Sequence, residues 1–471
     1  MNSQGAGAAR PALGVVVAAL WVLAGGCSEE PAPPGSPLRP NLLMISVDTL
    51  RADHVSAYGH DRPTTPAIDA LAEEGVLFEN AYSHAPVTSV SHMSLLTSLQ
   101  PEAHGVSMWT DVATSRLSES IPTLATVLRE HGYQTAARTA GGYMAGLFGF
   151  DQGFSAFHET YELEQAVDES LEELRSLAKG SERPFFYFLH TFAVHAPYTP
   201  EEPYRGMFAD PAYSGSILSD RDALVREAGP KWAAQNRAYW KRVEPDDPAD
   251  LQHLRDLYDA GIRRTDDQLA RFLRELERSG LLKHTLIVFL SDHGDEFMEH
   301  GQFLHKQLYQ ELLHVPLVIR FAGDRGERFR GRREDALVRL IDVFPTVLDA
   351  AGLPIPDHLQ GVSLLPLLEG EAAPPEVLMS SWSKRELESL RLGDWKLVVG
   401  PEGAELYDLA RDPLERTDLS GREPARVAEM KASLAERVDA SRRFLGDARP
   451  GVPVEPDPAT RQRLRALGYV D

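Results

Sequence analysis

Residues 285–309, TLIVFLSDHGDEFMEHGQFLHKQLY, join a buried-strand pattern to a dense group of carboxylate and imidazole side chains. Thr285 to Leu290 are all apolar or β-branched, which fits one buried parallel strand. Asp292 and His293 follow almost directly, and Gly294 permits a tight turn. Ligands of open α/β sheets bind beyond the carboxyl ends of strands, where such side chains are ligands for a divalent cation. The stretch predicts a metal site, with a charged and solvated loop as the alternative.

Two other apolar runs end in residues of the same chemical kind. Asn41 to Ser46 form a second predicted strand, which leads through Val47 into Asp48. Phe185 to Phe192 form a third, and His195 stands just past its end. Because the carboxyl ends of parallel strands meet at one edge of a sheet, we expect these residues to lie near the Asp292–His293 pair. A single histidine at such a position is more often structural. Three strands that all end in residues of this kind make a chance arrangement a weaker explanation.

A hydroxyl-rich segment precedes a predicted helix. Helical spacing of apolar residues begins near Ser91 and is closed by Pro101. Thr88, Ser89 and Ser91 therefore crowd a helix N-terminus, where free backbone N–H groups and the macrodipole favour an anion. Hydroxyl groups at this position are commonly N-caps, and that simpler interpretation stays open.

Composition limits the classes of partner. The chain has 471 residues, of which 43% are hydrophobic, so it can form a large domain and a smaller one. Its formal charge of −22 excludes nucleic acid as a favourable partner. A polyanionic substrate would need a locally positive or metal-centred pocket to offset this charge.

The N-terminus carries a predicted export signal. Arg10 precedes an apolar segment, residues 12–24, that is too short for a membrane-spanning helix and ends in LAGGC. The pattern resembles a bacterial lipoprotein signal, with residues 1–26 removed and a lipid on Cys27, although the leucine lies four residues before the cysteine instead of the usual three. An ordinary cleaved signal peptide is the alternative. Residues 27–39 predict a flexible tether. The prediction is an exported bacterial lipoprotein, periplasmic or anchored to the outer membrane.

Cys27 is the only cysteine of the chain, so no disulfide can form within it. The predicted lipid anchor on this sulfur would also make the membrane a partner of the protein, through its N-terminus alone.

Hydrophobic periodicity predicts long helical segments around the strands. Residues 64–83 and 337–352 predict one helix each, and residues 251–279 predict an amphipathic helix that leads into the 285–290 strand. Residues 201–249 lack a clean period. We interpret them as an insertion that could roof the site, with a plain surface excursion as the alternative.

The last hundred residues predict a different arrangement of secondary structure. Short strands joined by glycine-containing turns predict an antiparallel sheet, followed by a helix over about 423–445. The predicted division is a catalytic α/β domain over residues 40–369 and an α+β subdomain over residues 370–471.

Several of these segments together resemble the sulfatase family within the alkaline-phosphatase superfamily. The resemblance implies a large mixed, mostly parallel sheet between helices, a small C-terminal antiparallel sheet, one divalent metal, and hydrolysis of a sulfate or phosphate ester. By family the metal is Ca²⁺, with Mn²⁺, Mg²⁺ and Zn²⁺ as alternatives. The segments that carry the resemblance are NLLMISVDTLRADHVSAYG, SHMSLLTSLQPEAHGV, FLHTFAVHAPY, LIVFLSDHGDEFMEHG, LYQELLHVPLVIR, DHLQGVSLLPLL and DWKLV with ELYDLARDP.

The resemblance also implies roles for individual residues. Asp48, Asp292 and His293 match metal ligands. Thr88 falls where sulfatases keep the cysteine that is oxidised to formylglycine, so it is expected to be the nucleophile and a further metal ligand. His195 matches the histidine beside the leaving oxygen, and His305 falls where many members have a lysine. His92 and Arg51 are expected to contact the substrate.

The sequence departs from the family pattern at the nucleophile. The family's C-x-P-S-R is TSVSH here, residues 88–92, and the second aspartate of the usual pair is Thr49. Threonine cannot give the aldehyde, so no formylglycine is expected. A sulfate ester of Thr88 would have to be cleared by attack of water, whereas threonine nucleophiles are used by phosphodiesterase and phospho-headgroup transferase relatives. A metal-bound hydroxyl at a helix N-terminus has a lowered pKa and a preorganised anion site.

These observations leave three functions open. The first is a metal-dependent hydrolase of sulfuric or phosphoric esters at the cell envelope, acting on a small molecule, glycan or lipid. The second is a phosphodiesterase or a transferase of a phospho-headgroup. The third is a non-catalytic lipoprotein that binds sulfated or phosphorylated glycans.

Overall fold

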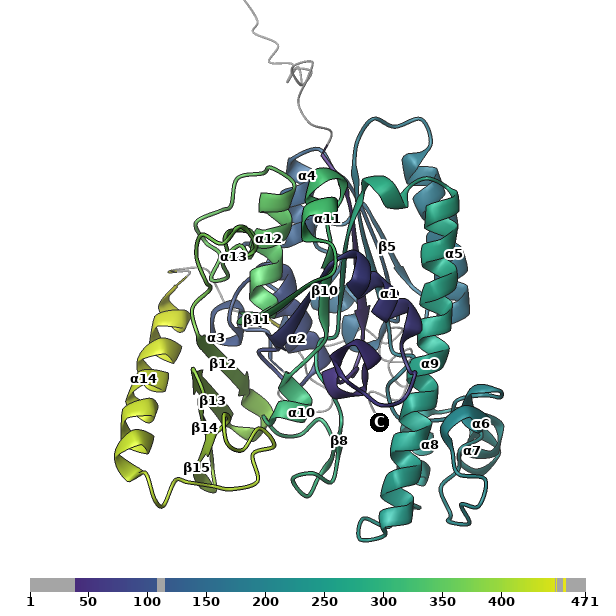
Figure 1. Ribbon diagram of the computed structural model, residues 1–471, viewed down its shortest axis with the longest axis vertical. Coiled ribbons are helices and arrows are strands. Elements are labelled where there is room, and N and C mark those ends of the chain that lie inside the picture. Colours follow the sequence, from purple (N-terminus) through teal and green to yellow (C-terminus); the bar gives the residue numbers. More distant parts are fainter. Residues whose placement is uncertain (1–38, 108–114, 445, 447–451, 455–471) are drawn as a thin grey trace, which may run out of the picture. The chain divides into compact units, whose positions relative to one another are not determined.

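The computed structural model describes residues 39–107, 115–444, 446 and 452–454 (Figure 1). The predicted signal peptide, Cys27 and nearly all of the predicted tether lie outside these residues. Among the described residues, no helix has the length and apolar character needed to cross a membrane.

An eight-stranded mixed sheet forms the centre of the described chain, in the order β11-β2-β10-β7-β1-β6-β4-β5. β10 is antiparallel to both of its neighbours, and the other paired strands run parallel. This sheet confirms the predicted fold class. Its strands are β1 (Asn41–Val47), β2 (Val76–Tyr82), β4 (Gln134–Thr139), β5 (Ala156–Glu159), β6 (Phe185–Thr191), β7 (Thr285–Leu290), β10 (Leu317–Arg320) and β11 (Arg332–Arg339).

Helices cover both faces of this sheet because its central strands are apolar on both sides. Leu42 and Met44 of β1 point into one core, and Leu43 and Ile45 into the other. The first core is closed by α2 (Thr88–Thr97), α4 (Leu124–Glu130), α12 (Val343–Ala350) and α13 (Leu365–Glu369). The second is closed by α1 (Pro66–Glu74), α5 (Leu163–Ala178) and α9 (Pro248–Arg278), the last two of which run alongside each other (Figure 1).

Two helix predictions are wrong in part. Residues 64–83 contain α1 and then β2, and residues 337–352 contain the end of β11 before α12. β2 and β11 pair with each other in parallel at one edge of the sheet. Short apolar strands that adjoin a helix continue its apolar pattern, here even across Gly75 between α1 and β2, and pairing with a distant strand distinguishes them.

The predicted insertion, residues 201–249, forms three short helices: α6 (Tyr204–Phe208), α7 (Arg221–Ala228) and α8 (Trp232–Trp240). It leads into α9, which is 31 residues long. The start of α9 is well defined, because the side chain of Asp247 accepts a hydrogen bond from Ala249 N and Pro248 occupies the first helical position.

The C-terminal part builds its own four-stranded antiparallel sheet, as expected. The helix α14 (Pro424–Arg443) packs its apolar side on this sheet through Met430, Leu434 and Val438. The strands are β12 (Val377–Trp382), β13 (Leu387–Leu392), β14 (Trp395–Gly400) and β15 (Gly403–Asp408). The remaining elements are α3 (Pro101–His104), α10 (Gln310–Leu313), α11 (Gly323–Phe329), β3 (Ser115–Arg116), β8 (Glu296–Phe297), β9 (Phe303–Leu304) and β16 (Val452–Pro453).

Candidate active site

The carboxyl ends of β1 and β7 bring the three predicted metal ligands together. In the register of these strands Ser46 lies opposite Leu290, so both chains leave the sheet at the same level. One ligand atom from each of Asp48, Asp292 and His293 lies within 4.8 Å of the others, and all three side chains are fully buried.

The unpaired atoms of this cluster fit a divalent cation. Neither carboxylate oxygen of Asp48 has a hydrogen-bond partner among the described residues, and the same holds for Oδ2 of Asp292. His293 donates from Nδ1 to the Gly294 carbonyl at 3.0 Å, which leaves the lone pair of Nε2 available, 3.4 Å from Asp292 Oδ2. Three buried carboxylate oxygens without hydrogen-bond partners are strongly unfavourable, and a bound cation would compensate them.

The pKa values of the two carboxylates also fit a site for a cation. Burial and the neighbouring Asp48 raise the pKa of Asp292 well above its usual range. Burial also opposes ionisation of Asp48, but the adjacent His190, whose Nε2 lies 3.6 Å from Oδ2, and the charges of His293 and His195 hold its pKa below the usual range. Without a cation, the protein therefore keeps one carboxylate of the pair ionised more readily than the other.

The backbone at the site is held in unusual positions. Thr49 has a φ of +59°, and its N–H donates to Asp292 Oδ1 at 3.3 Å. Its carbonyl accepts a hydrogen bond from Tyr258 OH at 2.6 Å. A Cβ at position 294 would lie 2.0 Å from the Glu311 carbonyl oxygen, so only glycine fits after His293. Backbone strain of this kind is concentrated at functional sites.

Thr88 is the first residue of α2, so the positive end of a helix points at the cluster. The Oγ1 atom of Thr88 lies 3.5 Å from His293 Nε2, and Thr88 is 5% exposed. Ser91, one turn further on, donates to the Asp292 carbonyl at 2.8 Å and so ties α2 to the loop after β7. Ser91 therefore has a structural partner, whereas Thr88 lies beside the predicted metal ligands.

His195 and His305 complete the group of histidines. Their ring centroids are 5.5 Å apart, and that of His305 is 4.5 Å from the ring of His293. His195 donates from Nδ1 to the Ala196 carbonyl at 2.7 Å, which leaves Nε2 as the nitrogen that can gain or lose a proton. The structure thus brings together all the side chains predicted to act in catalysis.

Asp295 positions His305. Its Oδ1 accepts a hydrogen bond from His305 Nδ1 at 2.7 Å, and its Oδ2 accepts one from Tyr198 OH at 2.6 Å. Asp295 is fully buried, and these contacts hold its pKa below the usual range although burial opposes this. A carboxylate two residues after His293 was visible in the sequence, but its partner His305 lies ten residues further on, just after β9.

His92 is corrected from a substrate contact to a positioning residue. The ring is fully buried: Nδ1 donates to the Thr88 carbonyl at 2.8 Å, and Ser46 Oγ lies 2.8 Å from Nε2. Burial, with the adjacent His190, lowers the pKa of His92 to about 3, so the ring is neutral. A neutral, enclosed ring cannot attract an anionic group, but it does fix the backbone of the predicted nucleophile.

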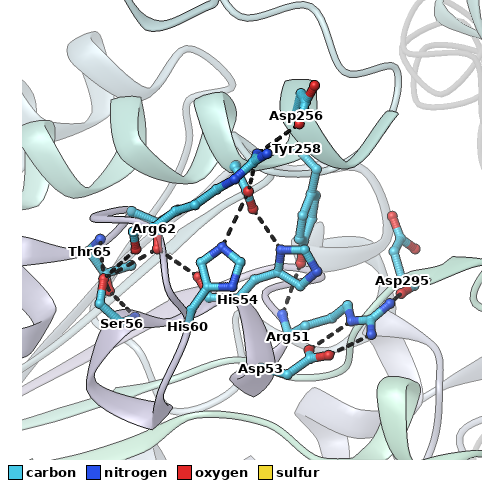
Figure 2. A network of polar contacts seen from close by, with 12 residues as sticks. Arg51, Asp53, His54, Ser56, His60, Arg62, Thr65, Asp256, Tyr258 and Asp295 are labelled. Atoms are coloured by element: carbon cyan, nitrogen blue, oxygen red, sulfur yellow. Dashed lines mark hydrogen bonds and ion pairs between the residues drawn. The ribbon is translucent and has the colours of Figure 1, made fainter. Parts of the chain in front are cut away.

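Arg51 is corrected in the same way, as Figure 2 shows. Its guanidinium pairs with Asp53 at 2.7 Å and Glu299 at 2.9 Å, and it also donates to the Asp295 carbonyl at 3.0 Å. The side chain is 5% exposed and lies over the Phe297 ring. All its described contacts are within the protein, where it joins the loop after β1 to the loop after β7.

His190 is a residue of the site that sequence reasoning missed. It lies in β6, is almost fully buried, and places Nε2 3.6 Å from Asp48 Oδ2. That nitrogen has no hydrogen-bond partner among the described residues. The signal was present, because His190 is the one histidine within the apolar run of this strand.

A second histidine–aspartate cluster lies in the loop after β1, and Figure 2 shows its surroundings. His54 Nδ1 is 2.6 Å and His60 Nε2 is 3.3 Å from the Asp259 carboxylate of α9. Arg62 pairs with the same carboxylate at 2.9 Å and with Asp256 at 2.8 Å. We name this group, residues 54, 60, 62, 256 and 259, the loop clamp, because it fixes the loop that carries Arg51 to α9.

Comparison with known proteins identifies the family of this chain. The sulfatase family model matches residues 40–353, and a model described as the C-terminal region of N-sulphoglucosamine sulphohydrolase matches residues 298–443. The chain is 25% identical to arylsulfatase K of Xenopus laevis, over 86% of this chain and 83% of the relative. It is also 25% identical to an N-acetylglucosamine-6-O-sulfatase of Bacteroides thetaiotaomicron, over 88% of each.

Solved structures share the fold. The phosphonate monoester hydrolase of Agrobacterium radiobacter superposes with a TM-score of 0.68 at 24% identity, and the match covers 89% of this chain and all of that one. A protein solved with its substrate D-glucosamine-2-N,6-O-disulfate also gives a TM-score of 0.68, at 22% identity over 87% and 99% of the two chains. The chain therefore belongs to the sulfatase family and is a hydrolase of sulfuric or phosphoric esters.

Proposed function

We propose that this protein hydrolyses a sulfate or phosphate ester of a glycan through a covalent adduct on Thr88. The observation that carries the proposal is the position of the Thr88 hydroxyl. It lies at the N-terminus of α2 and 3.5 Å from Nε2 of His293, one of the three predicted metal ligands. The names of relatives that act on sulfated sugars support a glycan substrate.

Residues of this chain account for binding of the ester. Asp48, Asp292 and His293 would hold a divalent cation, which supplies Lewis-acid polarisation of the ester and lowers the pKa of a neighbouring hydroxyl. The first N–H groups of α2 stabilise negative charge on the ester oxygens. His305 adds a donor when its ring carries a second proton. Burial and His293 lower the pKa of His305 and so oppose that second proton, whereas the hydrogen bond to Asp295 favours it, and the negative charge of a bound ester would favour it too.

The chemical steps then need one nucleophile and one acid. The Thr88 hydroxyl loses its proton to solvent and its oxygen attacks sulfur or phosphorus. The bond from that atom to the glycan oxygen breaks, and His195 donates its Nε2 proton to the departing oxygen. Water then gives a proton to the now neutral His195 and attacks the adduct, and the bond to the Thr88 oxygen breaks to release sulfate or phosphate. General acid help of this kind typically contributes about 10²–10⁴-fold.

Two ester types fit this scheme for different reasons. The named relatives favour sulfate. Thr88 favours phosphate, because an alkoxide ester cannot collapse as a formylglycine hydrate does. If water cannot reach the Thr88 adduct, the same residues would instead transfer a phospho-headgroup to another acceptor.

The test is turnover of an aryl sulfate, a phosphate monoester and a phosphodiester, after removal of metal and with Ca²⁺, Mn²⁺, Mg²⁺ or Zn²⁺ restored. Thr88→Ala should abolish the accepted reaction, and intact-mass measurement of the wild type should detect an adduct on Thr88. The matched control is Thr97→Ala, since Thr97 is an equally buried threonine at the other end of α2 that bonds to the Met93 carbonyl. Full activity of Thr88→Ala would exclude this nucleophile, and ligand binding without turnover of any ester would favour a non-catalytic glycan-binding protein.

We further propose that the protein is an exported lipoprotein anchored through Cys27. The support is the N-terminal sequence pattern alone. Mass spectrometry of the mature N-terminus tests it: a lipid-modified Cys27 is expected, and an unmodified N-terminus elsewhere would instead indicate an ordinary signal peptide.

A further inference from the structure

A cavity of about 400 Å³ opens beside His195. Its walls come from the loop after β6, the start of α5, the insertion helices α7 and α8, and the middle of α9. This volume is within the range of small-molecule sites, and it is enough for a monosaccharide ring. We call it the α8 cavity.

The α8 cavity adjoins the candidate active site through one shared side chain. His195 lines the cavity, and its ring centroid is 5.9 Å from that of Trp232 at the start of α8. The ring centroid of His195 is also 5.5 Å from that of His305. Because His195 is the proposed donor to the departing oxygen, the group attached to that oxygen lies on the side of the α8 cavity.

The lining is suited to a ring with hydroxyl groups. Trp232 and Tyr161 provide aromatic surface, and Tyr161 is 40% exposed. An aromatic side chain presents an apolar face on which a sugar ring can pack, while the hydroxyl groups at the edge of the sugar remain hydrated.

The charges of the lining cancel. Two arginines and two glutamates line the cavity, and they pair as Arg221 with Glu162 at 2.9 Å and Arg264 with Glu201 at 2.5 Å. Arg264 also pairs with Glu164 at 2.8 Å. Each pair offers donors and acceptors at the rim, but neither arginine is left to neutralise an additional anion. An acidic sugar would therefore find neither arginine of the lining available to neutralise its charge.

We propose that the α8 cavity binds an uncharged sugar residue of the leaving group, next to the sugar that carries the ester. This inference rests on the proposed hydrolysis of a glycan ester, and it adds the position and charge of the neighbouring sugar. Trp232 is then a specificity-determining residue supplied by the insertion, outside the motifs shared with the family.

The kinetic test compares three substrates that carry the same ester group. They are an aryl ester, a 6-O-ester of the N-acetylglucosamine dimer, and the same ester on a disaccharide of glucuronic acid and N-acetylglucosamine. Trp232→Ala should raise KM for the neutral dimer roughly tenfold more than it raises KM for the aryl ester. Trp232→Phe should restore most of the loss. The wild type should prefer the neutral dimer to the acidic disaccharide by about tenfold.

Control and binding measurements keep the inference testable. Trp395→Ala removes another half-buried tryptophan, in β14 of the C-terminal sheet, and should change none of these ratios. Equilibrium binding of the unesterified N-acetylglucosamine dimer, measured by calorimetry, needs no turnover, so it separates this inference from the proposed reaction. Loss of dimer binding in Trp232→Ala would support the cavity even if no ester is hydrolysed. Equal losses on all three substrates, unchanged dimer binding, or a preference for the acidic disaccharide would overturn it.

Discussion

The cluster of Asp48, Asp292 and His293 and the loop clamp contain the same types of residue but differ in how their charges are compensated. In the first, three carboxylate oxygens have no hydrogen-bond partner among the described residues. In the second, His54, His60 and Arg62 all contact the Asp259 carboxylate, so the protein itself supplies the positive charge.

This difference separates a binding site from a structural contact. Ligand types and distances alone group both clusters as candidates for a metal. A buried carboxylate that is already paired with an arginine gains little from a cation, because the arginine would have to be displaced first. A buried carboxylate without partners remains unfavourable until a cation binds. The compensation of charge, more than the composition, distinguishes the two sites.

The largest expected effect comes from removing a ligand of the first cluster. Asp48→Asn should lower kcat/KM by about 10³-fold or more, because it weakens cation binding and the polarisation of the ester. Metal content by elemental mass spectrometry and turnover of the accepted ester check this. Asp259→Asn in the loop clamp is the matched variant and should keep its metal. Equal loss of metal from both variants would contradict the distinction between the two clusters.

The next effect is on stability. Asp259→Asn should lower the free energy of unfolding by about 3 kcal/mol, because it leaves His54 and Arg62 facing a neutral amide in a mostly buried place. Denaturant unfolding of the metal-loaded protein measures this. Asp267→Asn is a suitable control, since its i,i+4 pair with Arg263 lies on the surface of the same helix. Equal destabilisation by both variants would show that the loop clamp is no stronger than a surface ion pair.

We expect acid to lower the contribution of the loop clamp to the free energy of unfolding. Burial opposes ionisation of Asp259, but His54 and His60 lower its pKa from 3.8 to about 2. A lowered pKa in the folded state contributes stability above pH 3.8, which is lost as the pH falls toward 2, and here it amounts to about 2 kcal/mol. Comparing wild type with Asp259→Asn at pH 7 and pH 2.5 checks this. A difference in stability that stays constant with pH would contradict it.

The smallest effect concerns a carboxylate within the active site that is fully partnered. Tyr198→Phe removes one of the two hydrogen bonds of Asp295, which should cost about 1 kcal/mol of stability and less than tenfold in kcat. Thermal unfolding and kinetics measure the two quantities, and bound metal should be unchanged. Loss of metal in this variant would show that Asp295 belongs functionally with the metal ligands. Tyr187→Phe, which also removes a buried phenol hydroxyl bonded to a carboxylate, is the control.

Much of the fold was predictable because its central strands are buried on both faces. The runs ending at Asp48, His195 and Asp292 are continuous and apolar, and this pattern needs no knowledge of neighbouring strands. β2 and β11 were missed because each adjoins a helix and is stabilised by pairing with a strand more than 200 residues away in the sequence. The helices of the insertion were missed because short helices show little periodicity.

The candidate active site was also predictable only in part. The sequence by itself determined which side chains stand at the strand ends, because the end of an apolar run is a local property of the chain. It could not determine which polar atoms have partners. Only the tertiary structure enclosed His92 and Arg51 among protein acceptors, placed Asp295 against His305, and left the oxygens of Asp48 without a partner. The reason is physical: hydrogen bonding and the compensation of buried charge depend on atoms from distant segments, and those atoms meet only when the sheet and its loops are assembled.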